Sequence, residues 1–170
     1  MTAIQVRGTA ATEERLDFDD LFRTEYPRLV SGLQLLTGSR AEAEDLAQDA
    51  LARIYERWSR VRGMDSPAGY LYTVALNLAR KRARRLRRTH VTPDPPTASD
   101  PEATAERREA IEAALRSLSR EQREALVVVE WLGYSPTDAA EVLGVSPESV
   151  RARLHRARST LRSRFGGADE

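Results

Sequence analysis

Residues 135–158 constrain the fold of this chain more than any other part of the sequence. Ser135 followed by Pro136 predicts a helix start, because a serine side chain caps free N–H groups and proline fits the first helical position. Gly144 is suited to the left-handed conformation that ends a helix, and the Ser-Pro pair at 146–147 repeats the start signal. The stretch therefore predicts two short helices joined by a tight turn.

The second of these helices has one apolar face and one basic face. Apolar residues recur at three- and four-residue spacing and predict a buried stripe: Val150, Leu154, Ala157 and Leu161. The opposite face carries basic residues: Arg151, Arg153, His155, Arg156 and Arg158. A surface hairpin with a solvated basic face is one interpretation. The small pair Ala139 and Ala140 in the first helix favours the other, a helix-turn-helix whose second helix lies in the major groove of DNA.

Composition narrows the classes of function further. The 170 residues allow one domain or two small ones. The absence of cysteine excludes disulfides, thiol nucleophiles and cysteine–zinc sites, and fits a cytoplasmic protein. No apolar run approaches the roughly 20 residues of a membrane span, so we expect no membrane insertion. The net charge is only +1, so the local distribution of charge matters more than its total.

Helical periodicity runs along both sides of a proline-rich segment. Apolar residues from Phe18 onward predict a helix that ends at Gly38, and the capping-box sequence at Ser39 opens a second helix to about Trp58. Its predicted buried stripe is Leu46, Ala50, Ile54 and Trp58. A loop at 61–66 precedes a third helix that starts at Pro67. Residues 126–132 are strongly apolar and predict a buried helix before the helix-turn-helix.

The predicted fold class is all-α, with two small helical domains joined by a flexible linker. Residues 1–16 lack periodicity and predict a disordered tail. We expect the first domain at 17–88, the linker at 89–104, where proline and small polar residues prevail, and the second domain at 105–165. We also expect the two domains to have separate cores.

Two charged surfaces stand out in the first domain. The helix opened by Ser39 has an outer face with Asp45, Gln48 and Asp49, and no basic stripe matches its spacing. These acids could serve only the helix dipole or form a partner surface, and both interpretations remain open here. The third helix ends in a run of seven basic residues: Arg80, Lys81, Arg82, Arg84, Arg85, Arg87 and Arg88. Their mutual repulsion favours a nucleic-acid partner over a merely solvated face.

Four motifs in this order give the chain a resemblance to a known family. They are F-D-D-L-F, A-E-D-L-A-Q-D-A-L, P-A-G-Y-L-Y-T-V-A-L-N-L-A-R and A-A-E-V-L-G-V-S-P-E-S-V-R-A-R-L-H-R-A-R. From about Phe18 to Leu161 the chain resembles a bacterial sigma factor of the extracytoplasmic-function (ECF) type. The resemblance implies a protein that binds core RNA polymerase and directs it to promoters. Region 2 would grip the clamp helices of the largest subunit and melt the minus-ten element, while region 4 would bind the minus-35 element and the polymerase flap.

The resemblance also assigns residues. Asp45, Gln48 and Asp49 would contact core polymerase. The minus-ten set would be Tyr70, Asn77, Arg80, Lys81 and Arg84, with the 61–66 loop capturing a flipped base. From their place on the second helix of the motif, the minus-35 set would be Glu148, Ser149, Arg151, Ala152, His155 and Arg156. Tyr70 stands where many relatives have Trp, which preserves the aromatic character. An anti-sigma factor would be a further partner.

Two other classes of protein compete with this interpretation. A helix-turn-helix repressor or activator that binds DNA as a dimer would explain residues 135–158, but neither charged surface of the first domain. An enzyme would need a catalytic constellation, yet His90 and His155 are far apart and no phosphate loop or nucleophile elbow is present. We therefore expect no catalytic residue, no metal and no cofactor.

Overall fold

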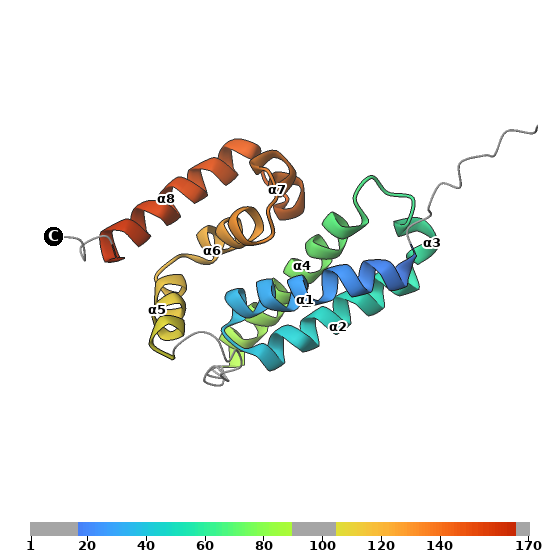
Figure 1. Ribbon diagram of the computed structural model, residues 1–170, viewed down its shortest axis with the longest axis horizontal. Helices are drawn as coiled ribbons and strands as arrows, with labels where there is room; N and C mark the ends of the chain where they lie inside the picture. The colour runs from blue at the N-terminus through green and yellow to red at the C-terminus, as the bar shows by residue number, and fades with distance from the viewer. Residues whose placement is uncertain (1–16, 90–104, 166–170) are drawn as a thin grey trace, which may run out of the picture.

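The computed structural model describes residues 17–89 and 105–165, and every regular element in these ranges is helical (Figure 1). The N-terminal unit contains α1 (Phe18–Thr37), α2 (Arg40–Glu56), α3 (Trp58–Val61) and α4 (Pro67–Thr89). The C-terminal unit contains α5 (Ala105–Arg116), α6 (Arg120–Leu126), a π-helical turn η1 (Val127–Trp131), α7 (Pro136–Leu143) and α8 (Pro147–Phe165). The all-α prediction is confirmed. The predicted tail and, apart from Thr89, the predicted linker lie outside the described residues.

Local sequence accounts for most helix ends in the N-terminal unit. Gly38 takes a left-handed conformation with φ 76° and donates its N–H to the carbonyl of Gln34, which closes α1. The Ser39 hydroxyl accepts from the N–H of Glu42 and opens α2. The prediction that Trp58 belongs to the buried stripe of α2 is wrong, because Trp58 lies outside α2 and is only partly buried. The helix ends at Glu56, and Trp58 opens α3, where its ring packs edge-on against Phe18 at 5.6 Å.

The core of the N-terminal unit lies where α1, α2 and α4 meet. Leu29 on α1, Ile54 on α2 and Leu71 on α4 are among its most deeply buried side chains. Leu46 and Ala50 are buried beside Ile54, as the predicted stripe requires. This packing leaves the polar residues of α2 and α4 facing outward, so the two helices carry the charged surfaces of the N-terminal unit.

The C-terminal unit departs from prediction at η1. Ser119 and Gln122 form a capping box that opens α6. The expected buried α-helix then gives way to a π-helical turn, in which the N–H of Leu132 bonds to the carbonyl of Val127 at 2.9 Å. The wider turn keeps Val128 fully buried but leaves Trp131 56% exposed, so the prediction of a uniformly buried helix is wrong at Trp131.

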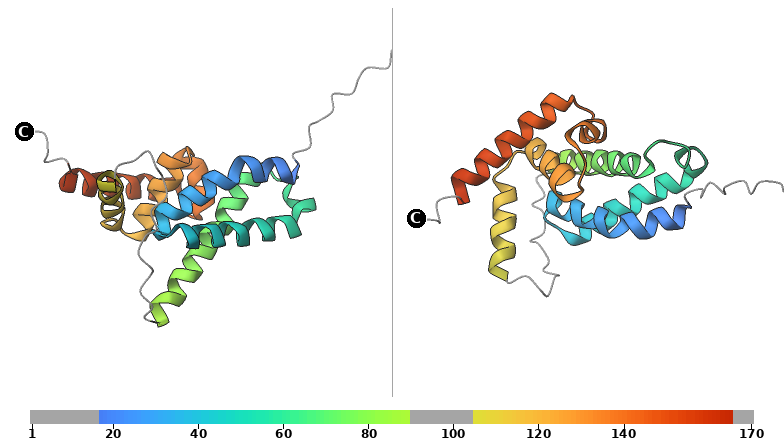
Figure 2. Two further views of the ribbon diagram at one scale, coloured as in Figure 1. Left: turned by 60° about the horizontal axis from the view of Figure 1, so that its bottom comes forward. Right: turned by 45° about the horizontal axis from the view of Figure 1, so that its top comes forward.

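The expectation of separate domain cores is also wrong, because the buried residues of the two units form one continuous cluster. Gly32 on α1 has no side chain, so Val127 and Leu132 lie close to its backbone. The ring of Tyr134 contacts Tyr72 edge-on, with centroids 5.8 Å apart. Helix α7 packs beside α4, and the views of Figure 1 and Figure 2 agree on this placement.

Three arginines cross between the units to carbonyl oxygens at helix ends. Arg28 donates to the carbonyl of Leu132 at 2.7 Å, at the end of η1. Arg123 donates to Leu36 at 3.1 Å, in the last turn of α1, and Arg80 reaches Leu143 at 3.5 Å, the last residue of α7. Carbonyls at helix C-termini lack intrahelical donors and carry partial negative charge, so guanidinium groups are suitable partners.

Candidate nucleic-acid interface

A cavity of about 690 Å³ opens between α2 and α4. All five residues predicted for minus-ten DNA line it: Tyr70, Asn77, Arg80, Lys81 and Arg84. They lie together because α4 is amphipathic and buries Leu71, Ala75 and Leu76 against the core, which turns the intervening residues toward this opening. The structure therefore brings the whole predicted set to one surface.

The α2 wall of this cavity was missed by sequence reasoning. Arg53 and Glu56 of α2, and Arg57 directly after the helix, line the cavity opposite the α4 residues. Five basic side chains thus surround the cavity with one acidic one, which suits an anionic ligand. The spacing of Arg53 and Arg57, four apart and next to the buried Ile54, was a signal in the sequence that these two share a face.

Among the residues that line the cavity, Arg80 is the one whose guanidinium group pairs with a carboxylate of the C-terminal unit. Its Nη2 lies 2.6 Å from Oε2 of Glu124 on α6, and its Nε lies 3.1 Å from Oε1. These contacts form a two-pronged pair across the units, with side chains only 20% and 5% exposed. The hydrogen bonds that Arg80 donates to the Glu124 carboxylate raise the pKa of Arg80. Lys81 and Arg84, in contrast, are exposed.

The C-terminal half of α4 extends away from the other helices, as the left view of Figure 2 shows. It carries the remainder of the predicted basic run, including the exposed Arg87 and Arg88. A helix that projects in this way presents its charges to solvent on several sides. The structure therefore offers a basic surface that continues from the cavity along α4.

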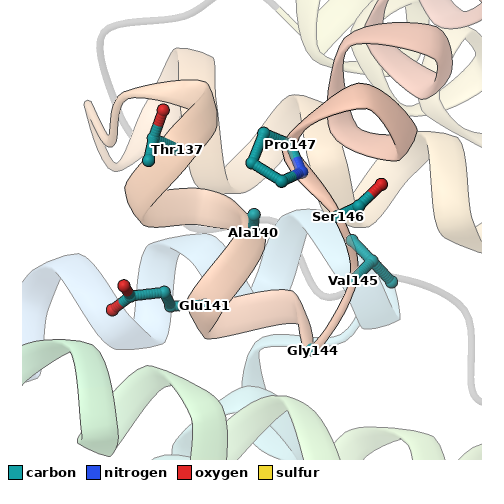
Figure 3. A pocket seen from close by; sticks show the side chains of 7 residues that line it. All are labelled: Thr137, Ala140, Glu141, Gly144, Val145, Ser146 and Pro147. Atoms are coloured by element: carbon teal, nitrogen blue, oxygen red, sulfur yellow. The ribbon is translucent and has the colours of Figure 1, made fainter.

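The helix-turn-helix predicted at 135–158 is present as α7, a turn and α8. Ser135 accepts from the N–H of Asp138 at 3.1 Å, Pro136 occupies the first turn, and Gly144 ends α7 with φ 68°. Figure 3 shows Ala140 and Pro147 pointing toward one another across the turn. They belong to the lining of a shallow, open hollow of about 620 Å³. The small side chain of Ala140 therefore lets the two helices meet closely.

Helix α8 presents the predicted minus-35 residues to solvent. Val150, Leu154 and Ala157 are buried against α6 and α7. The opposite face exposes Glu148, Arg151, Ala152, His155 and Arg156, with Ser149 partly buried. Leu161 is only partly buried, so the predicted stripe weakens toward the end of the helix.

Contacts among the exposed α8 residues are local. Arg151 pairs with Glu148 at 3.1 Å, and Arg156 Nε lies 3.3 Å from the carbonyl of Ala152. Hydrogen bonds from its own backbone N–H and from Ser146 lower the pKa of the Glu148 carboxyl. Arg158 pairs with Glu130 and is thereby tied to η1. The first turns of α8 thus combine an ionised acceptor with accessible donors, the groups that read base edges.

The acidic residues of α2 are exposed as predicted, but the premise that they lack a basic neighbour is wrong. Asp45, Gln48 and Asp49 face solvent. Arg82 on α4 lies 3.3 Å from Glu42 and 3.9 Å from Asp45. Sequence spacing could not show this pairing, because α4 crosses α2 only in the folded structure. With its side chain 66% exposed, Asp45 still has a surface available to a partner.

The described residues contain neither a helix able to span a membrane nor a cluster of three or more metal-ligating side chains. His155 lies on the exposed face of α8, whereas His90 lies outside the described residues.

Comparisons with known proteins agree with this architecture. Residues 21–89 match the model of Sigma-70 region 2, and residues 108–161 match Sigma-70, region 4. The RNA polymerase sigma-E factor of Streptomyces coelicolor is 32% identical over 160 residues, which are 92% of this chain and 90% of that protein. The ECF RNA polymerase sigma factor SigM of Mycobacterium tuberculosis is 32% identical over 155 residues, which are 90% of this chain and 79% of that protein.

Solved structures show the same fold. The sigma factor RpoE of Bartonella quintana, solved in complex with the anti-sigma factor NepR, superposes with a TM-score of 0.75 at 26% identity, covering 91% of this chain and 99% of that one. CnrH, solved with the cytosolic domain of CnrY, gives a TM-score of 0.62 at 23% identity, and the match covers 90% of this chain and 89% of CnrH.

These matches place both helical units in the Sigma-70 class of transcription initiation proteins. The chain belongs to the ECF family of RNA polymerase sigma factors. It binds core RNA polymerase and directs it to promoter DNA. The alternative of a dimeric helix-turn-helix repressor or activator is not favoured, because the region 2 match accounts for the whole N-terminal unit.

Proposed function

We propose that the cavity between α2 and α4 holds the minus-ten strand of the promoter as it separates from its complement. The observation that carries this proposal is the convergence of Tyr70, Asn77 and three basic residues of α4 with Arg53 of α2 and Arg57 directly after it. Proteins bind single-stranded nucleic acid by stacking its bases on aromatic side chains and by placing basic side chains along its phosphate backbone. The exposed part of the 61–66 loop adjoins this surface in the chain and would receive the flipped base.

Helix α8 would read the minus-35 element in duplex form. The face of its N-terminal half that carries Glu148, Arg151, Ala152, His155 and Arg156 is exposed, and the N-terminal part of a recognition helix is the part that enters the major groove. Arg151 can donate two hydrogen bonds to one guanine base, and Glu148 can accept a hydrogen bond from the amino group of cytosine. Ser149, Ala152 and His155 would complete the contact surface, while Arg158 would hold a phosphate or the polymerase flap.

Core polymerase would bind the Asp45, Gln48 and Asp49 face through the clamp helices of its largest subunit. Exposure of these three side chains supports this assignment. Since the relative RpoE was crystallised with an anti-sigma factor, we extend an anti-sigma partner to this chain as well. The protein would act in the cytoplasm, where RNA polymerase acts, and would itself catalyse no reaction.

Promoter opening by reconstituted holoenzyme tests the role of the cavity. Core RNA polymerase would first select a promoter from a genomic library, and permanganate footprinting on it would then measure melting. Lys81→Ala with Arg84→Ala should reduce melting and flatten its salt dependence by about two counterions, since each lost phosphate contact removes nearly one.

Arg88→Ala with Arg87→Ala is the matched control, because it removes the same charge from the same helix outside the cavity lining. The control should retain more melting than the cavity variant. Equal melting by both variants would contradict the assignment of the cavity to the minus-ten strand.

A further inference from the structure

The pair formed by Arg80 and Glu124 joins a residue of the proposed DNA-binding cavity to the C-terminal unit. Glu124 lies on α6, outside the cavity lining, yet both of its oxygens lie within 3.2 Å of Arg80 nitrogens. A carboxylate that meets a guanidinium group through two oxygens makes the same contact as a phosphate. Glu124 therefore occupies the place on Arg80 that a strand phosphate would take.

Contacts around this pair make it the centre of a larger junction. Arg80 also reaches the carbonyl of Leu143 at the end of α7. About two turns before Arg80 on α4, the Thr73 hydroxyl lies 3.3 Å from the carbonyl of Val142. The C-terminal unit thus docks along one face of α4 through the same residue that lines the cavity.

Each member of the pair has a second partner of its own. Arg120, one turn before Glu124 on α6, lies 3.7 Å from Oε1 of Glu124. Asn77, one turn before Arg80 on α4, accepts from Arg80 at 3.4 Å. When the units separate, Glu124 keeps Arg120 as a cationic neighbour and Arg80 can take a phosphate. Separation therefore leaves neither charge without a partner, which a reversible junction requires.

We propose that the face of α4 around Arg80 is a docking surface for the C-terminal unit of the same chain, and that single-stranded DNA competes with Glu124 for it. This inference rests on the proposed role of the cavity. The docked chain binds a single strand weakly because Arg80 is occupied, whereas the exposed face of α8 stays accessible. By linkage, a strand that displaces Glu124 must also drive the units apart.

Two measurements on the full-length chain without polymerase test the proposal. The first is the affinity for a fluorescent 12-nucleotide oligo-dT, which probes the cavity without requiring a promoter sequence. The second is the distance between spin labels on Thr24→Cys and Ser159→Cys, both exposed positions, one in each unit. The sequence has no native cysteine, so labelling is confined to these two sites.

Glu124→Gln removes the charge that competes for Arg80 and keeps the shape of the side chain. It should bind oligo-dT on the order of tenfold more tightly, the value of one charged hydrogen bond, and lengthen the label distance. Glu141→Gln is the matched control, because it removes an exposed charge from α7, and it should change neither quantity to this extent. Oligo-dT added to the wild-type chain should lengthen the same distance.

The proposal is overturned if Glu124→Gln changes affinity and distance no more than Glu141→Gln does. It is also overturned if the distance lengthens while the affinity stays the same. Should circular dichroism show that Glu124→Gln unfolds, Glu124→Asp replaces it, since it keeps the charge near Arg120 but shortens the reach to Arg80. The role of the cavity fails separately if adding Arg84→Ala to Glu124→Gln leaves oligo-dT affinity unchanged, whatever the label distance reports.

Discussion

Tyr72→Phe should destabilise the chain although it removes a single oxygen atom. The Tyr72 hydroxyl donates to Oε2 of Glu25 at 2.7 Å, and the two residues are 3% and 7% exposed. The edge-on contact with Tyr134 does not depend on the hydroxyl, so the ring packing remains. The variant therefore isolates one hydrogen bond to a buried carboxylate.

Its magnitude follows from what remains around Glu25. A hydrogen bond to a charged group contributes about 1.5–3 kcal/mol, because loss of the donor leaves a desolvated acceptor. Arg28 lies 3.7 Å from the other oxygen, Oε1, and compensates in part. We expect the free energy of unfolding to fall by about 2 kcal/mol, which for a chain of this size lowers the melting temperature by about 4–8 °C.

Urea denaturation followed by circular dichroism measures this loss, with an unchanged m value showing that the unfolded state is unaffected. Tyr55→Phe is the matched control, since Tyr55 is 65% exposed and its variant should change stability by less than about 0.5 kcal/mol. The reasoning is refuted if the two variants are equally stable.

Three further predictions concern pH, polymerase and promoter. Burial raises the pKa of Tyr134 to about 12 and that of Tyr72 above its usual range. The folded state thus favours the neutral form of both phenols. The stability that they contribute is fully present below the pKa of tyrosine in the unfolded chain, near 10. The free energy of unfolding, measured by urea titration, should fall as the pH rises above that value. Asp45→Arg with Asp49→Arg should weaken binding to core polymerase in a fluorescence assay without unfolding the chain. Arg151→Ala should remove roughly 1–3 kcal/mol of binding free energy at one base position and relax the preference there, which a promoter-mutant panel measures.

Each of the last two predictions has an internal check. Arg82→Ala removes the basic neighbour of Asp45 and should leave polymerase affinity largely intact, since exposed ion pairs contribute little to stability. Unchanged affinity of the Asp45 and Asp49 double variant would exclude the acidic face. Arg158→Ala should weaken all promoter sequences about equally. If Arg151→Ala did the same, its role would be electrostatic only.

Helix ends and buried stripes were predictable because they depend on neighbours in sequence. Ser39, Ser119 and Gly144 all act as local chemistry requires. The five minus-ten candidates, which the family resemblance assigned, also lie on one helix, α4, whereas the cavity that they line needs α2 as its second wall. Helix ends and buried stripes need only the geometry of a single helix.

The features that escaped prediction depend on residues far apart in the chain. The pairing of Arg80 with Glu124 spans 44 positions, and that of Arg28 with Leu132 spans 104. No periodicity in either segment encodes such a partner. The π-helical turn is a different case, since Val127, Val128 and Val129 give the same apolar pattern in α and π geometry.

The three arginines that hold helix-end carbonyls have a consequence for solution experiments. Guanidinium chloride supplies the same planar cationic donor at molar concentration, whereas urea is neutral. Guanidinium should therefore displace Arg28, Arg80 and Arg123 from their carbonyls before either helical unit unfolds. Denaturation would then take two steps in guanidinium chloride and one in urea, so the choice of denaturant decides whether the chain behaves as one cooperative body or as two.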